Sequence, residues 1–107
     1  MISEKRLQEI IFQSLKEIQD SRPSRQKVEW NEDTIVLGEG GPLDSIAFAA
    51  FAADFEERIE NEMGQEYILK IDEIYALEEG KSAFTVREMA ELVCRLIDQA
   101  QKSRTTN

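Results

Sequence analysis

The chain has 107 residues, of which 41% are apolar and 33% are charged, so it is long enough for one domain with a single hydrophobic core. Its formal net charge of −9 argues against direct binding to nucleic acids, because their phosphates would be repelled. The single cysteine, Cys94, excludes an intrachain disulfide, and the absence of histidine argues against zinc sites and against Ser-His or Cys-His catalysis.

The negative charge is concentrated in the middle of the chain. Residues 52–81 contain ten acidic and three basic residues, and residues 31–51 contain four acidic residues and no basic one. A partner that approaches this region should present lysine and arginine, unless the acids only form a solvated surface that keeps the protein soluble. Neither a membrane-spanning run nor the apolar segment of a signal peptide is found, so we expect a cytoplasmic protein without membrane insertion.

A first helix is predicted over about residues 3–20. Apolar residues recur there at the three-and-four spacing of an amphipathic helix, at Leu7, Ile10, Ile11, Leu15 and Ile18. Over residues 20–43 this periodicity is lost and glycine, proline and serine accumulate, with Pro23 stopping the helix, which predicts a long loop. Trp30 and the apolar residues that follow can hold this loop against the helices. A short strand over residues 34–37 is possible, but no second segment suggests a partner strand.

A second helix is predicted from Ser45 to about Met63, with Asp44 as its N-cap and Gly64 as a left-handed C-cap. One apolar stripe on this helix is expected to belong to the core and consists of Phe48, Phe51, Ala52, Phe55 and Ile59. A second apolar patch lies on the opposite side and consists of Ile46, Ala50 and Ala53. This patch either contacts a partner or reflects only the high helix propensity of alanine.

Two further helices are predicted after residue 64. A short third helix, closed by Gly80, is suggested by Ile71, Ile74, Tyr75 and Leu77. Thr85 and Glu88 have the spacing of a capping box, which predicts that the last helix begins there. Its apolar face consists of Val86, Met89, Ala90, Val93, Leu96, Ile97 and Ala100. Cys94 lies at the edge of this face, which favours a small core residue over a reactive thiol.

These segments together predict an all-α fold. The expected architecture is a small antiparallel four-helix bundle with three longer helices, a short third helix and a long first loop. We expect residues 1–100 to form a single domain and residues 101–107 to form a flexible polar tail.

One motif points to a function. The sequence Gly41-Pro42-Leu43-Asp44-Ser45, followed by Ile46, places a serine in the first turn of the second helix, where free N–H groups and the helix dipole favour an attached phosphate. In this context the chain resembles the acyl carrier proteins, in which a serine after Leu-Asp at the start of the second helix carries 4′-phosphopantetheine. The resemblance covers nearly the whole chain, because the order of helices and the long first loop are also typical of that family.

The resemblance implies a monomeric carrier that is not itself an enzyme. Ser45 would be the attachment residue for the phosphopantetheine of coenzyme A, and Asp44 would help a phosphopantetheinyl transferase to position the coenzyme and Mg²⁺. The thiol of the arm would hold acyl groups as thioesters for enzymes of fatty acid, polyketide or specialised lipid synthesis, and the bundle interior could admit an acyl chain. The glycines at 38–41 are expected to give the serine a mobile loop. Partner enzymes with basic docking patches are expected to bind Ile46, Ala49, Ala50, Ala53, Asp54 and Glu57.

The sequence also departs from the usual pattern of this family. Many carrier proteins have a glutamate a few residues after the serine and larger aliphatic residues on the side that faces the partner, whereas this chain has Ala49 and Ala50, and its first acid is Asp54. We therefore expect a specialised freestanding carrier with a dedicated partner enzyme. The alternative hypothesis is an unmodified acidic helical adaptor that binds a basic protein, and this binding should be sensitive to charge reversal at Asp54, Glu57 and Glu60. An enzyme is less supported, because no carboxylate pair or phosphate-binding loop is recognisable.

Overall fold

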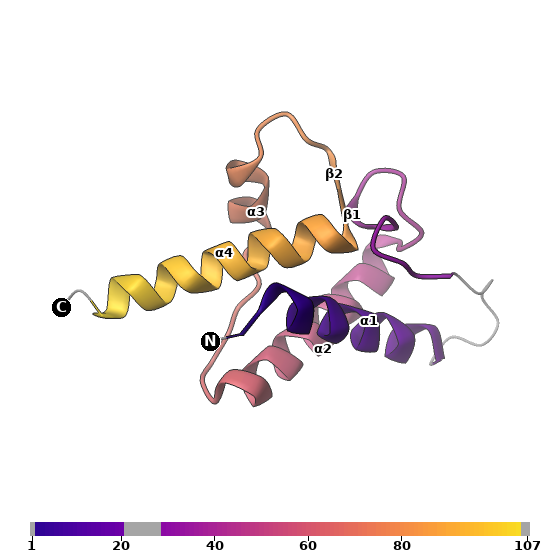
Figure 1. Cartoon of the computed structure of the whole chain (residues 1–107). Helices are drawn as coiled ribbons and strands as arrows, with labels where there is room; N and C mark the ends of the chain where they lie inside the picture. The colour runs from indigo at the N-terminus through magenta and orange to yellow at the C-terminus, as the bar shows by residue number, and fades with distance from the viewer. Residues whose placement is uncertain (1, 21–28, 106–107) are drawn as a thin grey trace.

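The computed structural model describes residues 2–20 and 29–105, with side chains up to residue 101. Most of these residues lie in four helices: α1 (Glu4–Asp20), α2 (Ser45–Met63), α3 (Ile71–Leu77) and α4 (Val86–Thr105). Figure 1 shows α4 crossing the molecule, with α1 and α2 below it in this view and α3 above it. In the described part of the chain, none of the helices combines the length and the apolar composition needed to cross a bilayer.

The core forms where α1 packs against both α2 and α4. The predicted stripe of α2 is confirmed: Phe51, Phe55 and Ile59 are completely buried, whereas Phe48 and Ala52 are partly buried. Stacking of Phe51 on Phe55, with ring centroids 5.7 Å apart, extends the core along the axis of α2. The other helices supply the large side chains that are completely buried around this stripe, among them Leu7, Ile11, Ile74, Met89 and Val93.

The predicted capping box at the start of α4 is confirmed. The Thr85 hydroxyl accepts a hydrogen bond from the Glu88 N–H at 3.2 Å, and the Glu88 carboxylate accepts one from the Thr85 N–H at 3.0 Å. At its other end α4 continues to Thr105, so residues 101–105, which we expected to belong to the tail, are helical. Residues 106–107 lie outside the described residues, as does Pro23, which we expected to stop the first helix.

The expectation of an all-α fold is wrong in one respect, because the described residues also contain a two-stranded antiparallel sheet. Strand β1 (Ile35–Gly38) confirms the strand considered near residues 34–37, and its partner β2 (Ala83–Thr85), which the sequence did not suggest, lies directly before α4. Ile35 pairs with Thr85 and Gly38 pairs with Ala83, with an irregularity between Ile35 and Leu37. A three-residue strand is too short to show an alternating pattern in sequence.

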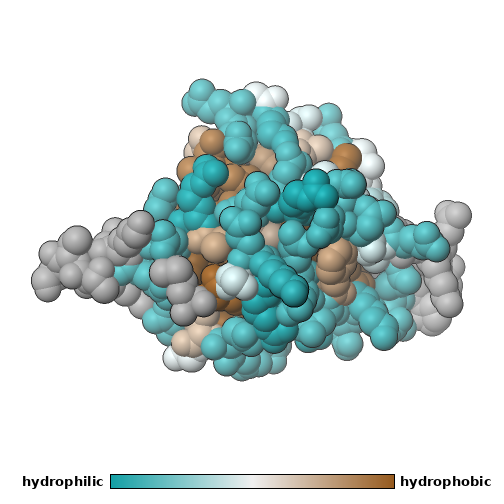
Figure 2. Space-filling model, viewed as in Figure 1, coloured by the Kyte–Doolittle hydropathy of each residue, from teal (hydrophilic) through white to brown (hydrophobic). Residues whose placement is uncertain are grey.

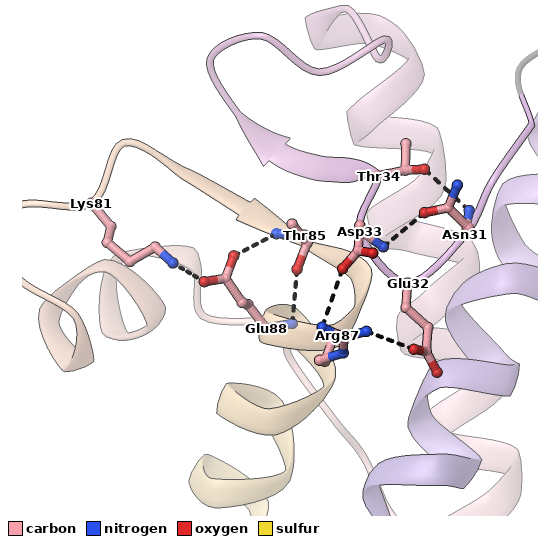
Figure 3. A network of polar contacts seen from close by, with 8 residues as sticks. All are labelled: Asn31, Glu32, Asp33, Thr34, Lys81, Thr85, Arg87 and Glu88. Atoms are coloured by element: carbon pink, nitrogen blue, oxygen red, sulfur yellow. Dashed lines mark hydrogen bonds and ion pairs between the residues drawn. The ribbon is translucent and has the colours of Figure 1, made fainter.

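Polar contacts fasten the segment before β1 to the start of α4 (Figure 3). The Arg87 guanidinium contacts the Glu32 carboxylate at 2.8 Å and the Asp33 carboxylate at 3.1 Å. The hydrogen bond to Glu32 raises the pKa of Arg87 above its ordinary value. The Arg87 backbone N–H also donates to the Glu32 carbonyl, and the Val86 N–H donates to the Thr34 carbonyl, both at 3.0 Å. The described part of the long first loop is therefore held against α4 before it enters β1.

Candidate functional site

Ser45 is the first residue of α2, and its side chain is exposed. The helix begins there because Asp44 has an extended backbone (φ −78°, ψ 176°) and its carboxylate accepts a hydrogen bond from the Ala47 N–H at 2.7 Å. The Asp44 carbonyl accepts a further bond from the Phe48 N–H at 2.8 Å. The predicted N-cap is thus confirmed, and the serine hydroxyl lies at the positive end of the helix dipole.

The loop that leads to Ser45 is packed closely at its start. At Gly38, where φ is +99°, a Cβ atom would lie only 2.1 Å from the Ser82 carbonyl oxygen, and the neighbouring Glu39 N–H donates to that oxygen at 3.0 Å. A Cβ atom on Gly41 would lie 3.0 Å from the Cγ2 atom of Ile35. These two glycines therefore allow close approach of backbone and side chains, which is a different role from the loop mobility that the sequence led us to expect.

The four small or apolar residues of the predicted partner surface are brought together. Ile46, Ala49, Ala50 and Ala53 are all exposed, whereas Ala47, between them in sequence, is buried. Ile46 is 73% exposed and is the large apolar side chain of this surface. Figure 2 shows one face of the molecule, where apolar side chains reach the surface in separate patches among hydrophilic ones.

The acidic residues of α2 have different surroundings. Glu57 is exposed, as a residue of a docking surface should be, but Asp54 is only partly exposed and forms an ion pair with Arg58 at 2.6 Å. Glu56 and Glu60 bind backbone instead: the Glu56 carboxylate accepts from the Leu69 N–H at 2.7 Å, and the Glu60 carboxylate accepts from the Tyr67 N–H at 3.4 Å. Sequence reasoning missed these two contacts, because the residues they join are 13 and 7 positions apart.

The acidic neighbour of Ser45 takes part in capping the helix. The neighbouring Asp44 carboxylate accepts the capping hydrogen bond from Ala47, and the chain has no histidine. Burial raises the pKa of the Cys94 thiol, which is the opposite of what a reactive cysteine requires. Among the described residues, no group of three or more acidic or cysteine side chains could hold a metal ion.

Comparison of the chain with protein-family models, with curated proteins and with solved structures gives no match.

Proposed function

We propose that this protein is an acyl carrier protein that holds acyl groups on a 4′-phosphopantetheine arm attached to Ser45. The observation that supports this most directly is the exposed position of Ser45 at the first residue of a helix capped by Asp44, immediately before the exposed Ile46. An acceptor serine must enter the active site of a transferase, and this position leaves its hydroxyl accessible. We infer further that the four helices adopt the antiparallel bundle arrangement of such carriers.

The residues present fit an attached phosphodiester. The N–H groups of Ser45 and Ile46 belong to the first helical turn, where the helix offers no internal acceptor, and the helix dipole favours negative charge there. In the modification, the Ser45 oxygen would form a bond to the phosphorus of phosphopantetheine, the pyrophosphate bond of coenzyme A would break, and the adenosine bisphosphate would leave while the serine loses its proton. When bound, the group would supply a thiol that holds an acyl chain as a thioester.

The exposed side of α2 would bind the enzymes that load and use this arm. Ile46 supplies an apolar anchor beside Ser45, and Ala49 and Ala50 leave a shallow surface that can accept large side chains of a partner. The exposed Glu57 would attract lysine or arginine at the edge of this surface. The small residues support a dedicated partner enzyme of a specialised pathway.

The test is intact-mass measurement after incubation of the protein with coenzyme A, Mg²⁺ and a phosphopantetheinyl transferase of broad specificity. We expect a mass increase that corresponds to one phosphopantetheine group and that is lost in Ser45→Ala. Ser82→Ala is the matched control, because Ser82 is also an exposed serine but lies outside a helix, and it should be modified as the wild type is. The absence of an adduct, or an adduct that persists in Ser45→Ala, would reject the proposal and favour the unmodified adaptor.

A further inference from the structure

A second apolar surface lies at the end of α2 that is remote from Ser45. The 19 residues of α2 span about 28 Å. Beyond its C-terminal end, a cavity of about 260 Å³ opens between the segment at 63–70 and the C-terminal half of α4. The apolar part of its lining consists of Met63, Tyr67, Ile68, Leu96, Ile97 and Ala100. We call this cavity the α4 groove.

Ile68 is the most exposed large apolar residue of the α4 groove, with 59% of its surface accessible. The residues on both sides of it are fixed. The Tyr67 N–H is bonded to Glu60, and the Tyr67 ring packs edge-on against Phe55 with centroids 6.3 Å apart. The Leu69 N–H is bonded to Glu56, and Leu69 is buried. Two carboxylates of α2 thus hold the backbone on either side of Ile68, so the segment presents this side chain from an ordered support.

The charges around the α4 groove are mainly negative. Glu66 and Glu73 contribute to its lining, and Lys70, the one basic residue among the described side chains of the lining, lies 3.5 Å from Glu73. Burial is the main cause that raises the pKa of Tyr67, and the carboxylates of Glu56 and Glu73 raise it further, in agreement with negative surroundings. An occupant should therefore combine apolar side chains with positive charge.

These charges decide between possible occupants. A second copy of the chain would also have a net charge of −9, and its exposed apolar face around Ile46 is flanked by Asp54 and Glu57, so it would bring acids towards acids. Anionic membranes and nucleic acids would be repelled for the same reason. We propose that the α4 groove binds an amphipathic helix of a basic partner protein. Apolar side chains of that helix enter the cavity beside Ile68, and its lysine or arginine residues face Glu66 and Glu73.

This binding does not depend on modification of Ser45, and it can be tested without knowledge of the natural partner. The probes are two synthetic helical peptides with the same leucine face, one with lysines and the other with glutamates on the polar face. Each is titrated into the full-length ¹⁵N-labelled protein, and amide shifts are followed by NMR. We expect the lysine peptide to shift residues 63–70 and 96–101 most strongly, and the glutamate peptide to cause no shifts.

Two exposed isoleucines provide a matched pair of variants. Ile68→Glu should weaken binding of the lysine peptide about tenfold or more, because an apolar contact is replaced by a charge. Ile46→Glu introduces the same charge at the other end of α2 and should leave unchanged the affinity that is measured from the shifts of residues 63–70 and 96–101. A second variant, Ala100→Phe, places a large uncharged side chain in the α4 groove from an exposed position on α4. It should weaken binding although it adds no charge.

Several results would overturn the proposal. These are equal binding of both peptides, shifts centred on the Ile46 face, and an affinity that is insensitive to both Ile68→Glu and Ala100→Phe. A dimer in sedimentation experiments that dissociates on Ile68→Glu would assign the α4 groove to a second copy of the chain. Ser45→Ala protein should bind the lysine peptide as the wild type does, so failure here and failure of the phosphopantetheine test can be told apart.

Discussion

Gly38 should be among the positions least tolerant of substitution, although it is exposed. Its φ of +99° is unfavourable for any residue with a Cβ atom, and a Cβ atom there would lie 2.1 Å from the Ser82 oxygen and 2.8 Å from the Ala83 Cα. Both neighbours are backbone atoms, one in β2 and one in the residue directly before it, so they cannot rotate away. Gly38→Ala therefore requires the end of β1 to separate from β2.

Gly80 provides the matched control for this substitution. Its φ is +88°, close to that of Gly38, but a Cβ atom there would have no neighbour within 4 Å. Gly80→Ala should therefore lower the free energy of unfolding only by the cost of a positive φ for a residue with a Cβ atom, about 1 kcal/mol. Gly38→Ala adds overpacking of about 1–3 kcal/mol and the loss of the Glu39–Ser82 hydrogen bond, about 1 kcal/mol. We expect a total near 3–5 kcal/mol.

The assay is urea unfolding followed by far-UV circular dichroism and by fluorescence of Trp30, the single tryptophan, which packs against the core from the segment before β1. Coincident transitions would justify a two-state comparison of free energies. In thermal unfolding, Gly80→Ala should lower Tm by about 4–8 °C and Gly38→Ala by several times as much. If the two variants lose the same stability, the close contact between β1 and Ser82 does not contribute to stability. The loop before Ser45 would then not be held by close packing at Gly38.

Three further variants test the core, a cap and an ion pair, each by urea unfolding. Phe51→Ala should cost about 3–5 kcal/mol, because the ring is completely buried; a loss below about 1 kcal/mol would contradict its place in the core. Thr85→Ala removes the hydroxyl that accepts from the Glu88 N–H and should cost about 1 kcal/mol. Hydrogen bonds from Arg6 lower the pKa of Glu62, so its contribution to stability is present above the ordinary pKa of glutamate and is lost as pH falls through the lowered value. Glu62→Gln should therefore differ from the wild type at about pH 7, and the difference should disappear as the pH falls through the lowered pKa of Glu62; a difference that persists in acid would refute this.

The helices could be predicted because their signals are local. The capping box at Thr85, the N-cap at Asp44 and the left-handed Gly64, with φ +72°, mark helix ends within three or four residues of sequence. Apolar spacing then identified most of the buried faces. It missed Ser14, which is completely buried in α1 at a position that fits the spacing but has a polar side chain.

The sheet could not be predicted, because its formation depends on residues far apart in sequence. Ile35 and Thr85 pair across 50 positions, and the pairing is supported by the ion pairs of Arg87 with Glu32 and Asp33. None of these residues has an unusual local pattern. The same reason explains why Gly38 suggested a mobile loop in sequence but makes a close backbone contact in three dimensions.

The acidic side chains of α2 look alike in sequence, but in the structure some of them make contacts within the protein and others do not. From sequence, Asp54, Glu57 and Glu60 are equivalent candidates for charge reversal in a test of docking to a basic partner. In the structure, reversal of Glu60 would place a cation at the backbone N–H of Tyr67, and reversal of Asp54 would place it beside Arg58, so either change would disturb the protein itself. Glu57 is exposed, and neither a hydrogen bond nor an ion pair is found for it among the described residues. Loss of partner binding on Glu57→Lys would therefore report on the docking surface, whereas the same loss at Glu60 would not separate docking from damage to the α4 groove.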